Sequence, residues 1–163
     1  MMDYNEEPRM DADETRIQEL EVDEPHPKKL VHREVAEAII GAAFEVHNHL
    51  GYGFLERVYQ RALQVELVKH GHHAELEQKI RVQYKGVIVG EYDADLVVDK
   101  KVIIEIKVAP QYSRADEAQL INELKATGFE VGMLINFGRT RVEYKRIVCQ
   151  SAFHPRPSAA QNL

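Results

Sequence analysis

The 163-residue sequence predicts an α/β fold in which a mixed β-sheet is flanked by helices. Three observations lead to this prediction. Apolar residues recur at helical spacing over 31–69, strand-like segments follow over 79–108, and another helical segment separates these from two more strands. The expected order of elements is α-α-β-β-β-α-β-β, in one domain over 30–150.

The first two helices are predicted from their apolar stripes. In the helix that begins near Val31, the stripe is made of Val35, Ile39, Ala42, Ala43 and Val46. Gly51-Tyr52-Gly53 interrupts this pattern, and a second helix follows over 55–69, with Gly71 as its stop. We expect its buried face to consist of Leu55, Val58, Tyr59, Ala62, Leu63 and Leu67.

Two tight turns organise the next three strands. Segments 79–84 and 87–92 flank Lys85-Gly86, which is a pattern typical of a β-hairpin. Segments 93–98 and 102–108 flank a second turn at Asp99-Lys100-Lys101. The sheet is therefore expected to begin with three consecutive strands.

The remaining elements form a crossover and an edge. Ser113 and Asp116 resemble a capping box that opens a helix reaching Thr127, and Gly128 ends it. The apolar run 131–137 predicts a strand that is covered on both faces and parallel to its neighbour. Segment 141–149 alternates and predicts an edge strand.

The charge is unevenly distributed along the chain. Residues 1–29 contain ten acids and four bases and so carry the whole net charge of −6. We interpret them as an acidic N-terminal arm, and 151–163 as a C-terminal tail. No apolar run approaches the roughly 20 residues that span a bilayer, so no membrane association is expected. With one cysteine, Cys149, no intramolecular disulfide can form, and a cytoplasmic location is the simplest interpretation.

The segment from Asp95 to Lys107 is the most informative for chemistry. Side chains alternate along a strand, so Glu105 and Lys107 share one face while Ile104 and Ile106 point to the other. Taken alone, this pattern is that of an amphipathic strand with one solvated side. Asp95 changes the interpretation, because it lies on the preceding strand where it can be opposite Glu105.

This pairing depends on the length of the turn. A two-residue turn at Asp99-Lys100 would pair Asp95 with Ile104 and send it to the wrong face. We therefore expect a three-residue turn, from Asp99 to Lys101, that puts Asp95 opposite Glu105. Two neighbouring carboxylates favour a hard cation such as Mg²⁺ or Mn²⁺, and a nearby lysine can stabilise charge on a phosphate.

The Asp95…Glu105-Ile106-Lys107 pattern, within this order of elements, resembles the PD-(D/E)XK nuclease superfamily. Gly53-Phe-Leu-Glu56-Arg-Val-Tyr59 resembles the signature of the GxxExxY proteins, a branch of that superfamily. The likeness runs from about Leu30 to Cys149 and includes the segments 119–122 and 132–138. It implies a restriction-endonuclease-like core.

The resemblance also implies roles for five residues. Asp95 and Glu105 would be metal ligands, Lys107 the catalytic lysine, Glu56 a helix-borne acid completing the metal site, and Gln119 a neighbour on the following helix. Two positions depart from the pattern: the family's proline before the aspartate is Ala94, and Glu123 stands where the branch often has tyrosine.

Simpler interpretations exist for several of these residues. Glu56 can be an exposed acid beside a partly buried tyrosine, and Gln119 a surface glutamine. The pairs His47/His49 and His72/His73 do not predict a zinc site, because no Cys or His pair at ligand spacing accompanies them.

We therefore predict a Mg²⁺- or Mn²⁺-dependent nuclease that hydrolyses phosphodiester bonds of nucleic acid, with DNA as the expected substrate. The alternative is a non-catalytic module that keeps the nuclease fold and binds nucleic acid or protein. The acidic arm is a candidate docking segment for a protein partner.

Deleting residues 1–29 should leave the melting temperature nearly unchanged, because this segment has few large apolar groups to contribute to a core. Thermal melts of the full chain and of the shortened chain measure this. A large loss of stability would show that the arm is part of the folded domain.

Overall fold

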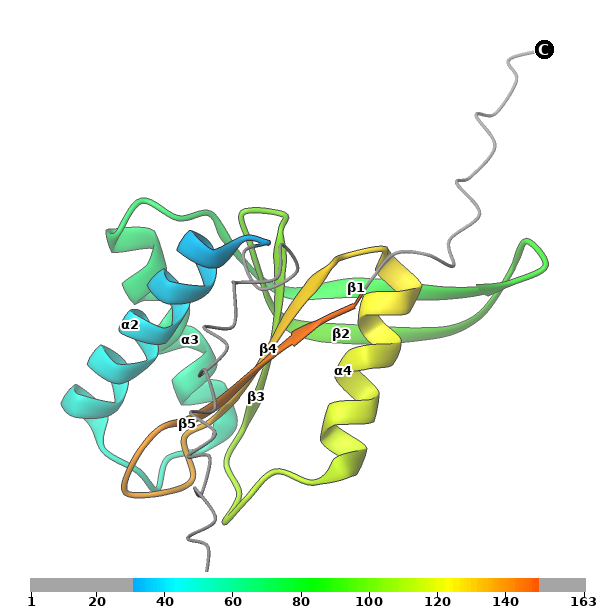
Figure 1. Ribbon diagram of the computed structural model, residues 1–163. Helices are drawn as coiled ribbons and strands as arrows, with labels where there is room; N and C mark the ends of the chain where they lie inside the picture. The colour runs from blue at the N-terminus through cyan, green and yellow to red at the C-terminus, as the bar shows by residue number, and fades with distance from the viewer. Residues whose placement is uncertain (1–30, 150–163) are drawn as a thin grey trace, which may run out of the picture.

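The computed structural model describes residues 31–149, so the predicted arm over 1–29 and the tail over 151–163 lie outside the described residues. The order of elements in the described part is the predicted one (Figure 1). The elements are α2 (Arg33–Leu50), α3 (Glu56–Lys69), β1 (Ala74–Tyr84), β2 (Val87–Val98), β3 (Val102–Lys107), α4 (Arg114–Thr127), β4 (Val131–Asn136) and β5 (Glu143–Val148).

The five strands form one mixed sheet in the order β1-β2-β3-β4-β5. β3 and β4 are parallel, as predicted from the helical crossover, and the other neighbouring pairs are antiparallel. β1 and β2 form a long hairpin that leaves the plane of the other strands (Figure 1). β5 is an edge strand, which confirms that prediction.

Helices cover both faces of the sheet. α2 and α3 pack on one face, where Ile104 and Ile106 of β3 point into the larger apolar core. α4 packs on the other face against a smaller core that includes Ile103 and Leu134 (Figure 1). The apolar stripe predicted for the first helix is buried along its whole length. The central strands are thus buried on both sides, which fits their continuous apolar sequence.

The local signals identified in the sequence are present. Ser113 and Asp116 form a reciprocal capping box at the start of α4. Val98 pairs with Val102, so the turn between β2 and β3 contains three residues, as expected. Asp99 and Lys100 both have positive φ, at 52° and 55°. This register directs Asp95 toward the position opposite Glu105.

Two predictions about the fold are wrong. The first strand begins at Ala74 rather than at residue 79, because 74–78 pair with the far end of β2 although the segment is rich in Glu and Gln, which are uncommon in strands. Leu55 and Val58, expected on the buried face of α3, are 80% and 37% exposed. They lie at the end of α3 that borders an open pocket rather than the core, and Gln60 is buried instead.

Gly138 should not tolerate a side chain, because an added Cβ would lie 2.3 Å from the backbone nitrogen of Ala109. We expect Gly138→Ala to cost about 2 kcal/mol or more and to lower Tm by at least about 5 °C. Gly41→Ala is the matched control, since nothing lies within 4 Å of its added Cβ on helix α2. It should stabilise by up to about 1 kcal/mol. Equal melting temperatures for the two variants would contradict the close contact at Gly138.

Candidate active site

Asp95 lies where β2 parts from β3. The two strands pair only from Val98 to Leu96, and beyond this point Asp95 Oδ2 accepts a hydrogen bond of 2.6 Å from the backbone amide of Ile106. The backbone carbonyl of Asp95 accepts a hydrogen bond of 2.9 Å from Gln60 Nε2 on α3. Asp95 is therefore held at β3 through its carboxylate and at α3 through its backbone carbonyl.

Glu105 and Lys107 share the α4 face of β3, as the alternation predicts. Lys107 Nζ lies 2.9 Å from Glu105 Oε1 and 3.8 Å from Asp116 Oδ1 at the start of α4. Glu105 is only 5% exposed, so this face is covered by α4 and is not the solvated side of an amphipathic strand. A buried acid on an otherwise apolar strand requires a partner, which Lys107 supplies in part.

The α4 helix adds two polar side chains to this cluster. Gln119 Nε2 donates to Glu105 Oε1 at 3.2 Å and to Glu123 Oε1 at 3.0 Å, so Gln119 is beside Glu105 rather than on the surface. Glu123, which stands where the branch pattern often has tyrosine, is 1% exposed. Its spacing of four residues from Gln119 on a helix was the signal that it would face the same cluster.

Glu56 is the least enclosed of the predicted residues. It begins α3 and is exposed, but it lines an open pocket of about 780 Å³ together with Asp95 and Gln60. The same pocket contains Glu77 and Asp93 of the hairpin, so it is rich in carboxylates. Its charge acts on both Asp95 and Lys107. Glu56 therefore belongs to the mouth of the site and not to its buried part.

Tyr59 lies in the core and holds the loop between α2 and α3. It is fully buried, its ring stacks on Phe137 at 4.6 Å, and its hydroxyl donates to the carbonyl of Gly51 at 2.8 Å. Phe54 N in turn donates to the Tyr59 hydroxyl at 3.3 Å. These contacts fix the α2–α3 loop, and with it the start of α3 where Glu56 lies.

The electrostatics of the site disfavour its negative charges. Burial, reinforced by the charges of Glu56 and Glu123, raises the pKa of Asp95 to about 6 despite the hydrogen bond from Ile106. Burial and the charge of Asp95 raise the pKa of Glu105 to about 7, although Lys107 opposes the change. Burial also raises the pKa of Glu123. The carboxyl groups are thus spaced closely enough to repel one another.

The charge of Lys107 is stabilised by the same cluster. Burial lowers its pKa, but the hydrogen bond to Glu105 and the charges of Glu105, Glu56 and Asp116 outweigh burial, and the pKa is raised. Lys107 therefore keeps its proton at neutral pH. This single ammonium does not balance the carboxylates around it.

The donor set fits a hard divalent cation. Oε2 of Glu105 is buried without a hydrogen-bond partner among the described residues, which leaves a carboxylate oxygen free for coordination. Asp95, Glu105 and Glu56 are the predicted ligands. In the described range 31–149, however, no three His, Cys, Asp or Glu side chains lie close enough to hold a metal ion as they stand. Metal binding would therefore require these carboxylate side chains to move closer together. Without a cation they repel one another.

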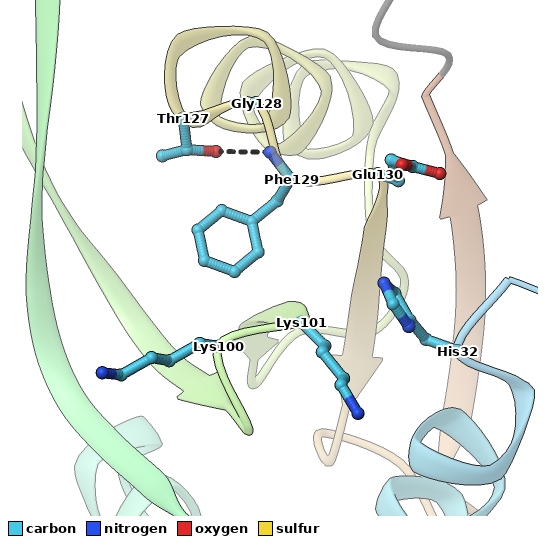
Figure 2. A pocket seen from close by; sticks show the side chains of 7 residues that line it. All are labelled: His32, Lys100, Lys101, Thr127, Gly128, Phe129 and Glu130. Atoms are coloured by element: carbon cyan, nitrogen blue, oxygen red, sulfur yellow. Dashed lines mark hydrogen bonds between the residues drawn. The ribbon is translucent and has the colours of Figure 1, made fainter.

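The histidines considered for a zinc site make other contacts. His47 Nε2 contacts the carbonyl of Arg139 at 2.8 Å, and His72 Nδ1 contacts Asp99 Oδ2 at 2.7 Å. A smaller pocket, of about 280 Å³, lies at the start of β3 and β4, the opposite end from Glu105. Figure 2 shows the residues that line it. Lys100, Lys101 and Glu130 are among its lining residues, the two lysine side chains point away from Glu130, and none of the predicted site residues lines it.

Comparison with known families agrees with this geometry. The family model of the PD-(D/E)XK nuclease superfamily matches residues 33–147, which is most of the chain and includes every predicted site residue. The chain belongs to the PD-(D/E)XK nuclease superfamily. Its mixed five-stranded sheet between helices is the restriction-endonuclease-like fold. Members of the superfamily are generally nucleases that typically use divalent metals, which implies nucleic-acid binding.

No curated protein matches this PD-(D/E)XK chain. Among solved structures it is similar to the one described as "Crystal structure of SSO0001", with 20% identity and a TM-score of 0.42. The match covers 74% of this chain and 60% of that one, so this chain spans less than two thirds of that protein.

Within 31–149, none of the helices is both long enough and apolar enough to cross a membrane.

The metal-free protein should lose stability as pH rises through the range in which Asp95 and Glu105 ionise. Folding raises their pKa values to about 6 and about 7. Their contribution to the free energy of unfolding is therefore fully present below the pKa values of the unfolded chain, and it is lost as pH rises through the higher pKa values of the folded protein. Melts in EDTA from about pH 5 to about pH 8 measure this. Asp95→Asn and Glu105→Gln should flatten the decline relative to wild type, which separates it from histidine titration. Parallel curves for all three proteins would contradict the raised pKa values.

Proposed function

We propose that this protein is a metal-dependent nuclease that hydrolyses phosphodiester bonds, with DNA as substrate and Mg²⁺ or Mn²⁺ as cofactor. The observation that carries this proposal is the arrangement of Glu105, whose Oε1 contacts Lys107 at 2.9 Å while its buried Oε2 has no partner in the described chain. Membership of the PD-(D/E)XK superfamily supports it.

The carboxylates would supply the oxygen ligands. Asp95 and Glu105 meet where β2 and β3 part, and Glu56 borders the same opening from the start of α3. When bound, a divalent cation would act as a Lewis acid on the phosphate and lower the pKa of a coordinated water. The hydrogen bond from the backbone amide of Ile106 fixes the Asp95 carboxylate, so the backbone of β3 sets its orientation.

Lys107 would act on the phosphate. It keeps its proton, and its side chain is 19% exposed while its ammonium is held beside Glu105. A fixed positive charge at this point stabilises the negative charge that develops on the phosphate oxygens. Gln119 would hold Glu105 in place through its amide nitrogen, 3.2 Å away.

We also propose membership of the GxxExxY branch and a role of Glu56 as a metal ligand. The spacing Gly53, Glu56 and Tyr59 supports both. Tyr59 would contribute through the fold, since its hydroxyl holds the loop that precedes Glu56. The acidic arm over 1–29 would bind a protein partner or a basic surface of the domain.

One observation favours the non-catalytic alternative. Within 31–149 the carboxylates do not form a ready-made group of three metal ligands. A protein that binds nucleic acid, with or without metal, and never cleaves it would match that alternative. Incubation with single- and double-stranded DNA and RNA, each with Mg²⁺ or Mn²⁺, distinguishes the two.

Lys107→Ala should reduce cleavage by about 100-fold or more but keep metal binding, because it removes charge stabilisation and no ligand. Asp95→Asn should abolish both while slightly raising the Tm of the metal-free protein above about pH 6, since it removes a repelling charge. Lys125→Ala, which changes an exposed lysine on the same helix as Gln119, is the control and should cleave like wild type. Cleavage that survives both site variants would contradict this assignment. Metal binding without any cleavage would support the alternative.

A further inference from the structure

Glu123 is a buried carboxylate that the proposed reaction does not use. It lies on α4, is 1% exposed, and its Oε2 has no hydrogen-bond partner in the described part of the chain. Oε1 accepts a single hydrogen bond of 3.0 Å from Gln119 Nε2. A buried carboxylate oxygen without a partner is costly, so a proton or a cation that satisfies it is to be expected.

Glu105 is in the same condition on the facing strand. It is 5% exposed, and its Oε2 is also without a partner among residues 31–149. One amide nitrogen, Gln119 Nε2, lies 3.2 Å from Glu105 Oε1 and 3.0 Å from Glu123 Oε1. Two carboxylates that share one donor group are close neighbours, and each keeps one oxygen free.

We propose that Glu123 is a further ligand of the divalent cation, so that the cation is held from the α4 side as well as from β2 and β3. This inference rests on the proposed function and deepens it, since it concerns the same site. The charges agree with it, because Asp95, Glu105 and Glu123, together with Glu56 at the mouth of the site, bring more negative charge than Lys107 balances, and a divalent cation offsets the excess. Oxygen donors of this kind are those that both ions prefer.

The competing role for Glu123 is to orient Gln119 while remaining protonated. In that role only an acceptor for the Gln119 amide is needed, and the negative charge is not. Glu123→Gln separates the two roles, because its side-chain oxygen still accepts from Gln119 while the charge is lost. Glutamine also matches glutamate in volume, so the packing of α4 against the sheet is preserved.

The test is calorimetric titration of the full chain with MnCl₂ and with MgCl₂, for wild type, Glu123→Gln, Glu123→Asp and the control Glu45→Gln, which changes an exposed acid on α2. We expect Glu123→Gln to bind at least about tenfold more weakly than wild type and to gain less Tm on adding metal. Glu123→Asp, which keeps the carboxylate, should bind more tightly than Glu123→Gln, and Glu45→Gln should bind like wild type.

Folding of each variant is checked by its metal-free melt, in which Glu123→Gln should have a Tm equal to or above that of wild type. Equal dissociation constants for wild type and Glu123→Gln would overturn this inference and leave the proposed function standing. Wild-type protein that binds neither ion would instead overturn the metal-dependent function, and this inference with it.

Discussion

The hydrogen bond between the Asp95 carboxylate and the backbone amide of Ile106 is the contact on which the rest of the site depends. β2 and β3 pair over only three residues each, after which β2 stays with β1 and β3 stays with β4 (Figure 1). The separation leaves a gap in the sheet, and a backbone amide at such a gap needs a new acceptor. Asp95 supplies it, at 2.6 Å, and the same bond holds its carboxylate near Glu105.

The covering of β3 by α4 gives the site its unusual electrostatics. Glu105 would be solvated on an open sheet, but α4 reduces its exposure to 5% and brings Gln119 and Glu123 beside it. Burial then becomes the largest cause of the raised pKa values of Asp95 and Glu105. The cost of this arrangement is offset by the apolar cores on both faces of the sheet.

The start of α4 links this helix to β3. In the capping box, Ser113 Oγ accepts from the backbone amide of Asp116, and the Asp116 carboxylate accepts from the backbone amide of Ser113. Asp116 Oδ1 is also 3.8 Å from Lys107 Nζ, so an acid in the first turn of the helix lies beside the lysine that ends β3. Helix capping and the position of the ammonium therefore depend on the same side chain.

The sequence alone determined the order of elements, the three-residue turn and the common face of Glu105 and Lys107, because alternation, turn residues and capping are properties of neighbouring residues. Only the tertiary structure decided how buried each residue is. Leu55 has the helical spacing of a core residue but is 80% exposed, and Glu123 resembles a surface acid but is 1% exposed. Burial depends on which distant elements pack together, and that information is not contained in the spacing of residues along one segment.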